Sequence, residues 1–246
     1  KRNKKPPVSH MLARMLYDST EGAPPGLESN HGGLMRWYRT TYITPLRNAL
    51  DIVETHLCKK EFDKIDFSKV PGVALKMYSK NAFPKHVPEQ FAEWQRKVAS
   101  GDAKINSNTV DPYTVVAEYV MHTATEAQKP TLEAFYHDQI AKFKAKFLKK
   151  YGADHIPSSV VVCDTSGSMT QCGGTPLNVA ISMAIWISSL AETDWKDIFF
   201  TFDHSPEIID LSHCTGLEDR VATTKAAPWG GNTDLQATFD LILRRA

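Results

Sequence analysis

An apolar run that ends in one carboxylate and two hydroxyls is the feature that most constrains the fold of this chain. The run covers residues 160–163, after Ser159, and is followed by Asp164, Ser166 and Ser168. Consecutive β-branched residues predict a buried strand of a parallel sheet, and open α/β sheets place ligands just past the carboxyl ends of such strands. The sequence therefore predicts a ligand site at the end of this strand.

The segments after this strand follow the order of a known family. A Gly-Gly-Thr-Pro sequence at 173–176 opens a helix to about residue 192, residues 197–203 form a second expected strand, and a Gly-Gly-Asn-Thr-Asp loop at 230–234 precedes a further helix. With the Asp-x-Ser-x-Ser pattern, this order resembles von Willebrand factor A domains and their metal-ion-dependent adhesion site. The resemblance covers roughly residues 157–246 and implies an α/β, Rossmann-like domain whose parallel sheet is flanked by helices.

The resemblance also implies a set of ligands for Mg²⁺ or another divalent cation, namely Asp164, Ser166, Ser168 and Thr233. Magnesium prefers near-octahedral oxygen ligation, and among these groups only Asp164 carries a formal charge. A cation held by so few charges stays electrophilic, so we expect its open position to bind a carboxylate or phosphate from a partner. The alternative is that Asp164 and the serines only cap a turn and a helix start.

Two further aspartates have alternative roles. Asp203 closes the second expected strand and is either an outer-shell residue near the metal or a turn residue. Asp234 follows Thr233 and is expected to cap the next helix, with an outer-shell role as the alternative. The family pattern ends with an aspartate after a later strand. We expect that residue beyond position 246, in an A-type domain that is truncated in this chain.

Composition limits the other classes of protein. The chain has 246 residues, 42% of them hydrophobic, which is enough for a real core, and its net charge of +1 gives no global preference for nucleic acid or membrane. The four cysteines lack Cys-x-x-Cys spacing, and neither a signal peptide nor a membrane-length apolar run is present. We therefore expect an intracellular, cytoplasmic protein without membrane association, with a nuclear or virion location as alternatives. The absence of an initial Met suggests a piece of a longer chain.

Residues 1–152 are expected to form a helical segment with short joints. Helix starts with proline in the first turn are expected at residues 44–45, 87–88 and 111–112. In the first of these helices the Thr44 hydroxyl is the expected N-cap, and apolar residues recur at helical spacing as far as Leu57. One more amphipathic helix is expected over residues 132–147, and residues 18–33 are expected to form a loop.

A helical segment followed by an A-type domain resembles the Ro ribonucleoprotein (TROVE) family. The closer resemblance is to an uncharacterised related family of plants, fungi and giant viruses. The residues that carry it lie at 38–39, 44–47, 63–71, 80–83, 104–106 and 231–235. The resemblance implies RNA binding by a helical ring, of which this sequence is expected to contain only the last part.

Basic and aromatic residues in the helical segment provide candidates for contact with RNA. Cations bind phosphates and aromatic rings stack on bases, and Trp37, Tyr38 and Tyr42 accompany the first arginines. The candidates are Arg36, Arg39, Arg47, Lys142, Lys144 and Lys146. The alternative is that the lysines solvate one helix face and favour its carboxyl end, while Trp37 belongs to the core.

Each enzyme template fails at a named position. The loop at 164–168 is similar to the phosphorylation loop of phosphoaspartyl enzymes, but Ser166 stands where those enzymes carry an acidic or basic residue, and no Asp-Asp pair follows. Gly-x-Ser-x-Gly and the Gly-Lys phosphate loop are also absent from the sequence. We therefore expect no catalytic activity.

The sequence thus favours a binding module that contacts an acidic protein partner through Mg²⁺. Two alternatives stay open: a ribonucleoprotein subunit that binds small RNA in RNA quality control, and a structural component of a large assembly such as a viral particle.

Overall fold

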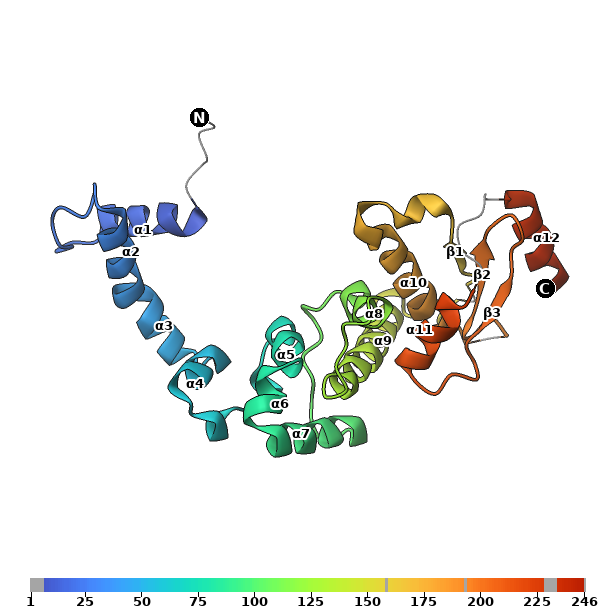
Figure 1. Cartoon of the computed structure of the whole chain (residues 1–246), viewed down its shortest axis with the longest axis horizontal. Coiled ribbons are helices and arrows are strands. Elements are labelled where there is room, and N and C mark those ends of the chain that lie inside the picture. The colour runs from blue at the N-terminus through green and yellow to red at the C-terminus, as the bar shows by residue number, and fades with distance from the viewer. Residues whose placement is uncertain (1–6, 158, 193, 228–233, 246) are drawn as a thin grey trace. The chain divides into compact units, whose positions relative to one another are not determined.

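Helices and one small sheet make up the structure, a computed structural model that describes residues 7–157, 159–192, 194–227 and 234–245 (Figure 1). The chain divides into two units, Lys1–Asp66 and Phe67–Ala246, here called the N-terminal and C-terminal units. Within the described ranges, none of the helices is long and apolar enough to cross a membrane.

The N-terminal unit is built around the packing of its first two helices. Ala13 and Tyr17 of the first helix and Leu34 of the second are buried together, with Trp37 packed against them. The elements are α1 (Val8–Ser19), α2 (His31–Tyr38), the π-helical turn η1 (Arg39–Ile43), α3 (Thr44–Ala49), α4 (Val53–Lys59) and the 3-10 turn η2 (Phe62–Lys64).

Two sequence expectations for this unit are wrong. The expected loop at residues 18–33 ends at Asn30, whose side chain accepts a hydrogen bond from the Gly33 amide and caps α2, so Gly32 and Gly33 are helical. Thr44 is not an N-cap, because Ile43 already has helical φ and ψ and the helix continues from α2 through η1. The chain then breaks at Asp51, where a φ of 50° separates α3 from α4.

The C-terminal unit begins with helices that pack through aromatic side chains. Phe67 contacts Phe83, Phe91 and Trp94 with ring centroids 5.1–5.6 Å apart. The helices starting at Pro88 and Pro112 and the long helix over residues 132–147 confirm the expectations from the sequence. The elements are η3 (Phe67–Lys69), α5 (Gly72–Ser79), α6 (Ala82–His86), α7 (Pro88–Ser100), α8 (Pro112–Val120) and α9 (Lys129–Tyr151).

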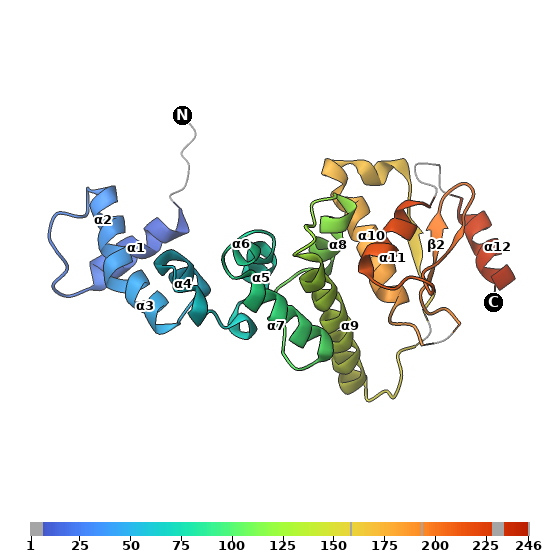
Figure 2. The same ribbon diagram turned by 60° about the horizontal axis from the view of Figure 1, so that its bottom comes forward.

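A mixed sheet completes the unit, in the order β1-β2-β3. β1 (Val162–Asp164) runs parallel to β2 (Ile198–Phe202), while β3 (Ile208–Asp210) is antiparallel to β2. α10 (Thr175–Ser188) is the crossover between the parallel strands and packs on both of them. It lies with α11 (Leu217–Lys225) on one side of the sheet and α12 (Leu235–Arg245) on the other (Figures 1 and 2).

The α/β class is confirmed in part. The described sheet is mixed rather than wholly parallel, because β3 returns beside β2 as a hairpin. The first strand is not a buried run: Cys163 is buried, but Val160 and Val162 are 41% and 43% exposed. Successive side chains of a strand point to opposite faces, so one face of β1 is covered and the other is partly open.

The helices before the sheet belong to the same unit as the sheet. α8 packs against α10 and α11, and α9 packs against α8. The sequence boundary expected at residues 152–157 lies in the segment that joins α9 to β1.

Candidate functional site

The candidate metal site starts at Asp164, the last residue of β1. Its Oδ1 accepts a 2.9 Å hydrogen bond from the Ser166 amide, which turns the chain sharply after the strand. Thr165 is buried between them, and its hydroxyl donates to the Phe202 carbonyl at the end of β2, 3.3 Å away. The loop is therefore fixed to the carboxyl edge of the two parallel strands.

The two serines of the pattern face each other. Their Oγ atoms lie 3.0 Å apart, with Ser166 half-buried and Ser168 exposed in the turn η4 (Gly167–Thr170). Adjacent ligands of an octahedral Mg²⁺ with bonds of about 2.1 Å are separated by about 3 Å. The spacing of the hydroxyls fits two neighbouring positions around such an ion.

Asp203 lies at the same edge of the sheet. Asp164 is opposite Phe202 in the parallel register, so Asp203 comes one residue past this edge. It is 6% exposed, and its Oδ1 accepts a hydrogen bond from the His204 amide. Burying a carboxylate costs free energy unless donors or a cation compensate its charge, which is consistent with a place beside a cation.

The remaining predicted residues are placed only in part. Thr233 lies outside the described residues. Asp234 accepts a 2.9 Å hydrogen bond from the Ala237 amide and so caps the start of α12, as the sequence predicts. Among the described residues no group of three or more His, Cys, Asp and Glu side chains could hold a metal, and the candidate site differs from such a group because it relies on hydroxyls.

The sequence placed a Gly-Gly pair before α10 but did not predict the backbone conformation of this loop. Cys172, Gly173 and Gly174 have consecutive φ values of 53°, 69° and 77°, in the left-handed region. Glycine adopts this region freely, but Cys172 has a Cβ and is strained there. The loop packs against η4, so it supports the turn that carries Ser168. The Gly-Gly pair at 173–174 is the sequence signal that could have predicted this left-handed conformation.

Comparison with known proteins identifies the family. Residues 6–150, more than half of the chain, match the family described as Domain of unknown function (DUF2828). The chain belongs to the DUF2828 family. Residues 158–246 match a second family, described as Domain of unknown function (DUF7788).

A viral relative matches both parts of this DUF2828 protein. An uncharacterised protein of Acanthamoeba polyphaga mimivirus is 30% identical over 237 residues, which cover 89% of this chain. The match covers 38% of the viral protein, so the chain spans well under half the length of that relative. No solved structure matches the chain.

The RNA candidates of the DUF2828 protein are divided between its two units. The arginines at 36, 39 and 47 belong to the N-terminal unit, and the lysines at 142, 144 and 146 lie on α9. Lys142 pairs with Asp138 at 2.7 Å, and Lys144 pairs with Glu192. These carboxylates neutralise two of the three lysines, which weakens the expectation of a phosphate-binding stripe on α9.

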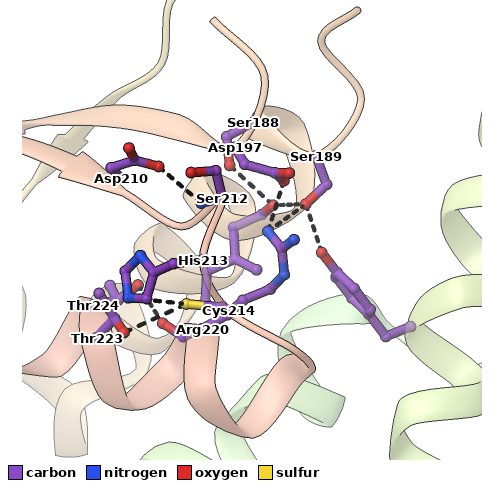
Figure 3. Close-up of polar contacts among 12 residues, drawn as sticks. Ser188, Ser189, Asp197, Asp210, Ser212, His213, Cys214, Arg220, Thr223 and Thr224 are labelled. Carbon is purple, nitrogen blue, oxygen red and sulfur yellow. Dashed lines mark hydrogen bonds and ion pairs between the residues drawn. The ribbon is translucent and has the colours of Figure 1, made fainter.

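A second polar cluster of the C-terminal unit lies beside α11 (Figure 3). Arg220 donates to Asp197 and lies 3.3 Å from the hydroxyl of Ser189, which in turn contacts the Tyr136 hydroxyl at 2.6 Å. The cluster joins α9, the end of α10, the start of β2 and α11. Its members bond to one another, so we assign it to stability.

Proposed function

We propose that this DUF2828 protein is a non-catalytic binding module whose A-type α/β domain holds Mg²⁺ at Asp164, Ser166 and Ser168. The ion would present an open position to a carboxylate of a protein partner, and Thr233 would complete the ligand set. The observation that carries the proposal is the 3.0 Å separation of the two serine hydroxyls in a turn fixed to the carboxyl edge of β1 and β2.

The division of charge explains why such a site would favour an acidic group. Asp164 is the charged member of the set, and the serines contribute neutral oxygens. When bound, Mg²⁺ supplies a positive charge that this set neutralises only in part. Ser168 is exposed, so a partner can approach from its side. The residues bind and orient, and none is placed to transfer a proton or a group.

The parallel β1–α10–β2 unit supports the fold part of the proposal. Open α/β sheets bind ligands outside the carboxyl ends of their strands, and both Asp164 and Asp203 stand at that edge. A simple turn cap would need only the Asp164–Ser166 amide bond. The two serine hydroxyls also hydrogen-bond to each other, and the same 3.0 Å spacing suits two neighbouring ligands of Mg²⁺.

Calorimetric titration of the full chain with Mg²⁺ tests the site, and Asp210 supplies a matched control. Asp210 also ends a strand and accepts from an amide two residues later, that of Ser212, at 2.8 Å. We expect Asp164→Ala to weaken Mg²⁺ binding at least tenfold and Asp210→Ala to leave it unchanged. Equal effects of both variants, or no binding to the unmodified chain at millimolar Mg²⁺, would contradict the proposal.

The partner contact is tested with peptides. A surface carrying a peptide with one glutamate should bind the chain in Mg²⁺ but not in EDTA, and the matching glutamine peptide should bind in neither. Retention in EDTA would mean that the turn residues, rather than a cation, make the contact.

A further inference from the structure

The N-terminal unit contains a cavity that the proposed function does not use. Its volume is about 620 Å³, and it is formed by the start of α1 and by one face of α2 and η1. The residues that matter here are His10, His31, Met35, Arg36, Arg39 and Thr40. Pockets for small ligands commonly have about 300–1,000 Å³, so this cavity can hold one organic molecule.

One helix face brings the polar groups together. Gly32, Met35, Arg36, Arg39 and Thr40 recur at the three- and four-residue spacing of a single helical face. At Arg39 the helix changes to a π-helical turn, in which the Thr44 amide donates to the Arg39 carbonyl. Such wide turns cost hydrogen-bond geometry and occur frequently at functional sites.

The charge of the cavity is wholly positive. Arg36 and Arg39 line it, no carboxylate does, and within the described part of the chain neither guanidinium forms an ion pair. Arg14 of the same unit differs, because its side chain pairs with Asp18 at 3.1 Å. Guanidinium groups bind phosphate through paired, charge-assisted hydrogen bonds. Two unpaired arginines in one concave site therefore favour a phosphate-bearing ligand.

The two histidines of the cavity pack on each other. The rings of His10 and His31 lie with centroids 4.3 Å apart and planes inclined by 36°. The Nδ1 atom of His10 is buried and has no hydrogen-bond partner among the described residues. Imidazole rings also stack on nucleobases.

We propose that this cavity binds a free mononucleotide, with its phosphate on Arg36 and Arg39 and its nucleoside against His10 and His31. The volume exceeds the needs of an inorganic anion, and the ring pair gives the nucleoside a surface on which to stack. The site lies within the N-terminal unit, so it is independent of the Mg²⁺ site proposed at Asp164.

Calorimetry of the full chain with AMP tests this proposal. We expect Arg36→Gln and Arg39→Gln each to weaken AMP binding at least tenfold and His10→Ala to weaken it about fivefold. Arg47→Gln, which changes an arginine outside the cavity lining, should leave the affinity unchanged, as should Asp164→Ala. The two arginines of the cavity are exposed, so their variants should keep the circular dichroism spectrum of the unmodified chain.

Three further ligands divide the recognition into parts. Adenosine and inorganic phosphate should each bind at least tenfold more weakly than AMP. Adenosine equal to AMP would overturn the role of the arginines, and phosphate equal to AMP would overturn the role of the histidines. A five-nucleotide oligoadenylate that binds more tightly than AMP would reassign the cavity to a nucleic acid strand. If AMP did not bind to the unmodified chain, the proposal would be refuted.

Discussion

The guanidinium of Arg220 donates a 2.7 Å hydrogen bond to the carboxylate of Asp197, and the two side chains are 13% and 11% exposed (Figure 3). Burial alone would lower the pKa of Arg220, but the hydrogen bond to the Asp197 carboxylate holds the pKa of Arg220 above its ordinary value. Asp197 itself adopts a left-handed φ of 59°, with its amide bonded to the Ser188 carbonyl. The pair therefore fixes the turn that leads from α10 into β2.

Arg220→Met should destabilise the C-terminal unit strongly. It leaves Asp197 buried without its partner, and breaking a buried ion pair from one side costs about 3–5 kcal/mol. Urea denaturation followed by circular dichroism measures the loss.

Lys97→Ala is the matched control for this ion pair. Lys97 pairs with Glu93 at the same 2.7 Å, but both side chains are 56% exposed. An exposed pair contributes about 0–1 kcal/mol, so the control should change stability little. A similar loss in both variants would show that burial does not set the contribution of the Arg220 pair.

Glu118→Gln should change the dependence of stability on pH. Burial alone would raise the pKa of Glu118, but hydrogen bonds from Thr123 and Lys80 and the charge of Lys76 hold it below the ordinary value of 4.5. The unfolded chain then binds the proton more readily, so the stabilisation is present above about pH 5 and is lost as the pH falls through the lowered pKa. The variant should be less stable by about 1–3 kcal/mol at pH 7, with a difference that shrinks toward pH 3.5.

Denaturation curves between pH 3.5 and pH 7 measure this difference. Glu93→Gln is the control, because the pKa of Glu93 is also lowered, first by a hydrogen bond from Lys97, although its side chain is 56% exposed. Solvent screens the pair of Glu93 with Lys97, so Glu93→Gln should change the pH dependence of stability much less than Glu118→Gln does. If the loss of stability in Glu118→Gln were the same at every pH, the lowered pKa of Glu118 would not be the source of its stabilisation.

Gly72→Ala should destabilise α5 through a steric clash. A Cβ at Gly72 would lie 2.2 Å from the backbone oxygen of Asn106 and 2.8 Å from a methyl group of Val110. Overpacking against backbone costs about 3 kcal/mol, because the backbone atom cannot rotate away. Thermal melting of the full chain measures the loss.

Gly101→Ala separates crowding from backbone conformation. Gly101 has a φ of +85°, yet an added Cβ would meet nothing within 4 Å among the described residues. The left-handed conformation alone costs about 1 kcal/mol, so this variant should lose less stability than Gly72→Ala. The reverse order would show that the contact with Asn106 relaxes.

The sequence predicted elements well where local signals determine them. Proline in the first turn placed the starts of α7 and α8 correctly. At residues 44–45 the same signal also matches the start of α3, but the N-cap role expected for Thr44 was wrong. The helix entering from α2 continues through η1, so no free helix end is left to cap. The antiparallel β3 was missed because its three residues lack a run that distinguishes them from a loop.

The sequence predicted which residues of the candidate site share one edge of the sheet, but not their detailed geometry. Residue order brought Asp164, Ser166 and Asp203 to one edge, since parallel strands joined by α10 end on the same side. The 3.0 Å contact between the serine hydroxyls depends on the turn geometry of η4, which spacing alone does not specify. The cavity beside His10 was not predictable, because it requires the packing of α1 on α2.

Buried and exposed cysteines of the chain should differ sharply in reactivity. Cys163 is buried in β1, and burial, assisted by the charge of Asp164, raises the pKa of its thiol to about 12. Because the thiolate is the nucleophile, this thiol should react with iodoacetamide at pH 8 at least about 100-fold more slowly than an ordinary exposed cysteine. Cys58 and Cys172 are exposed and should react rapidly in the native protein. Mass spectrometry of labelled peptides, in buffer and in urea, measures each site, and urea should make Cys163 reactive. Rapid native labelling of Cys163 would show that β1 opens readily, and the turn that carries Asp164 and Ser166 would then lack a fixed base.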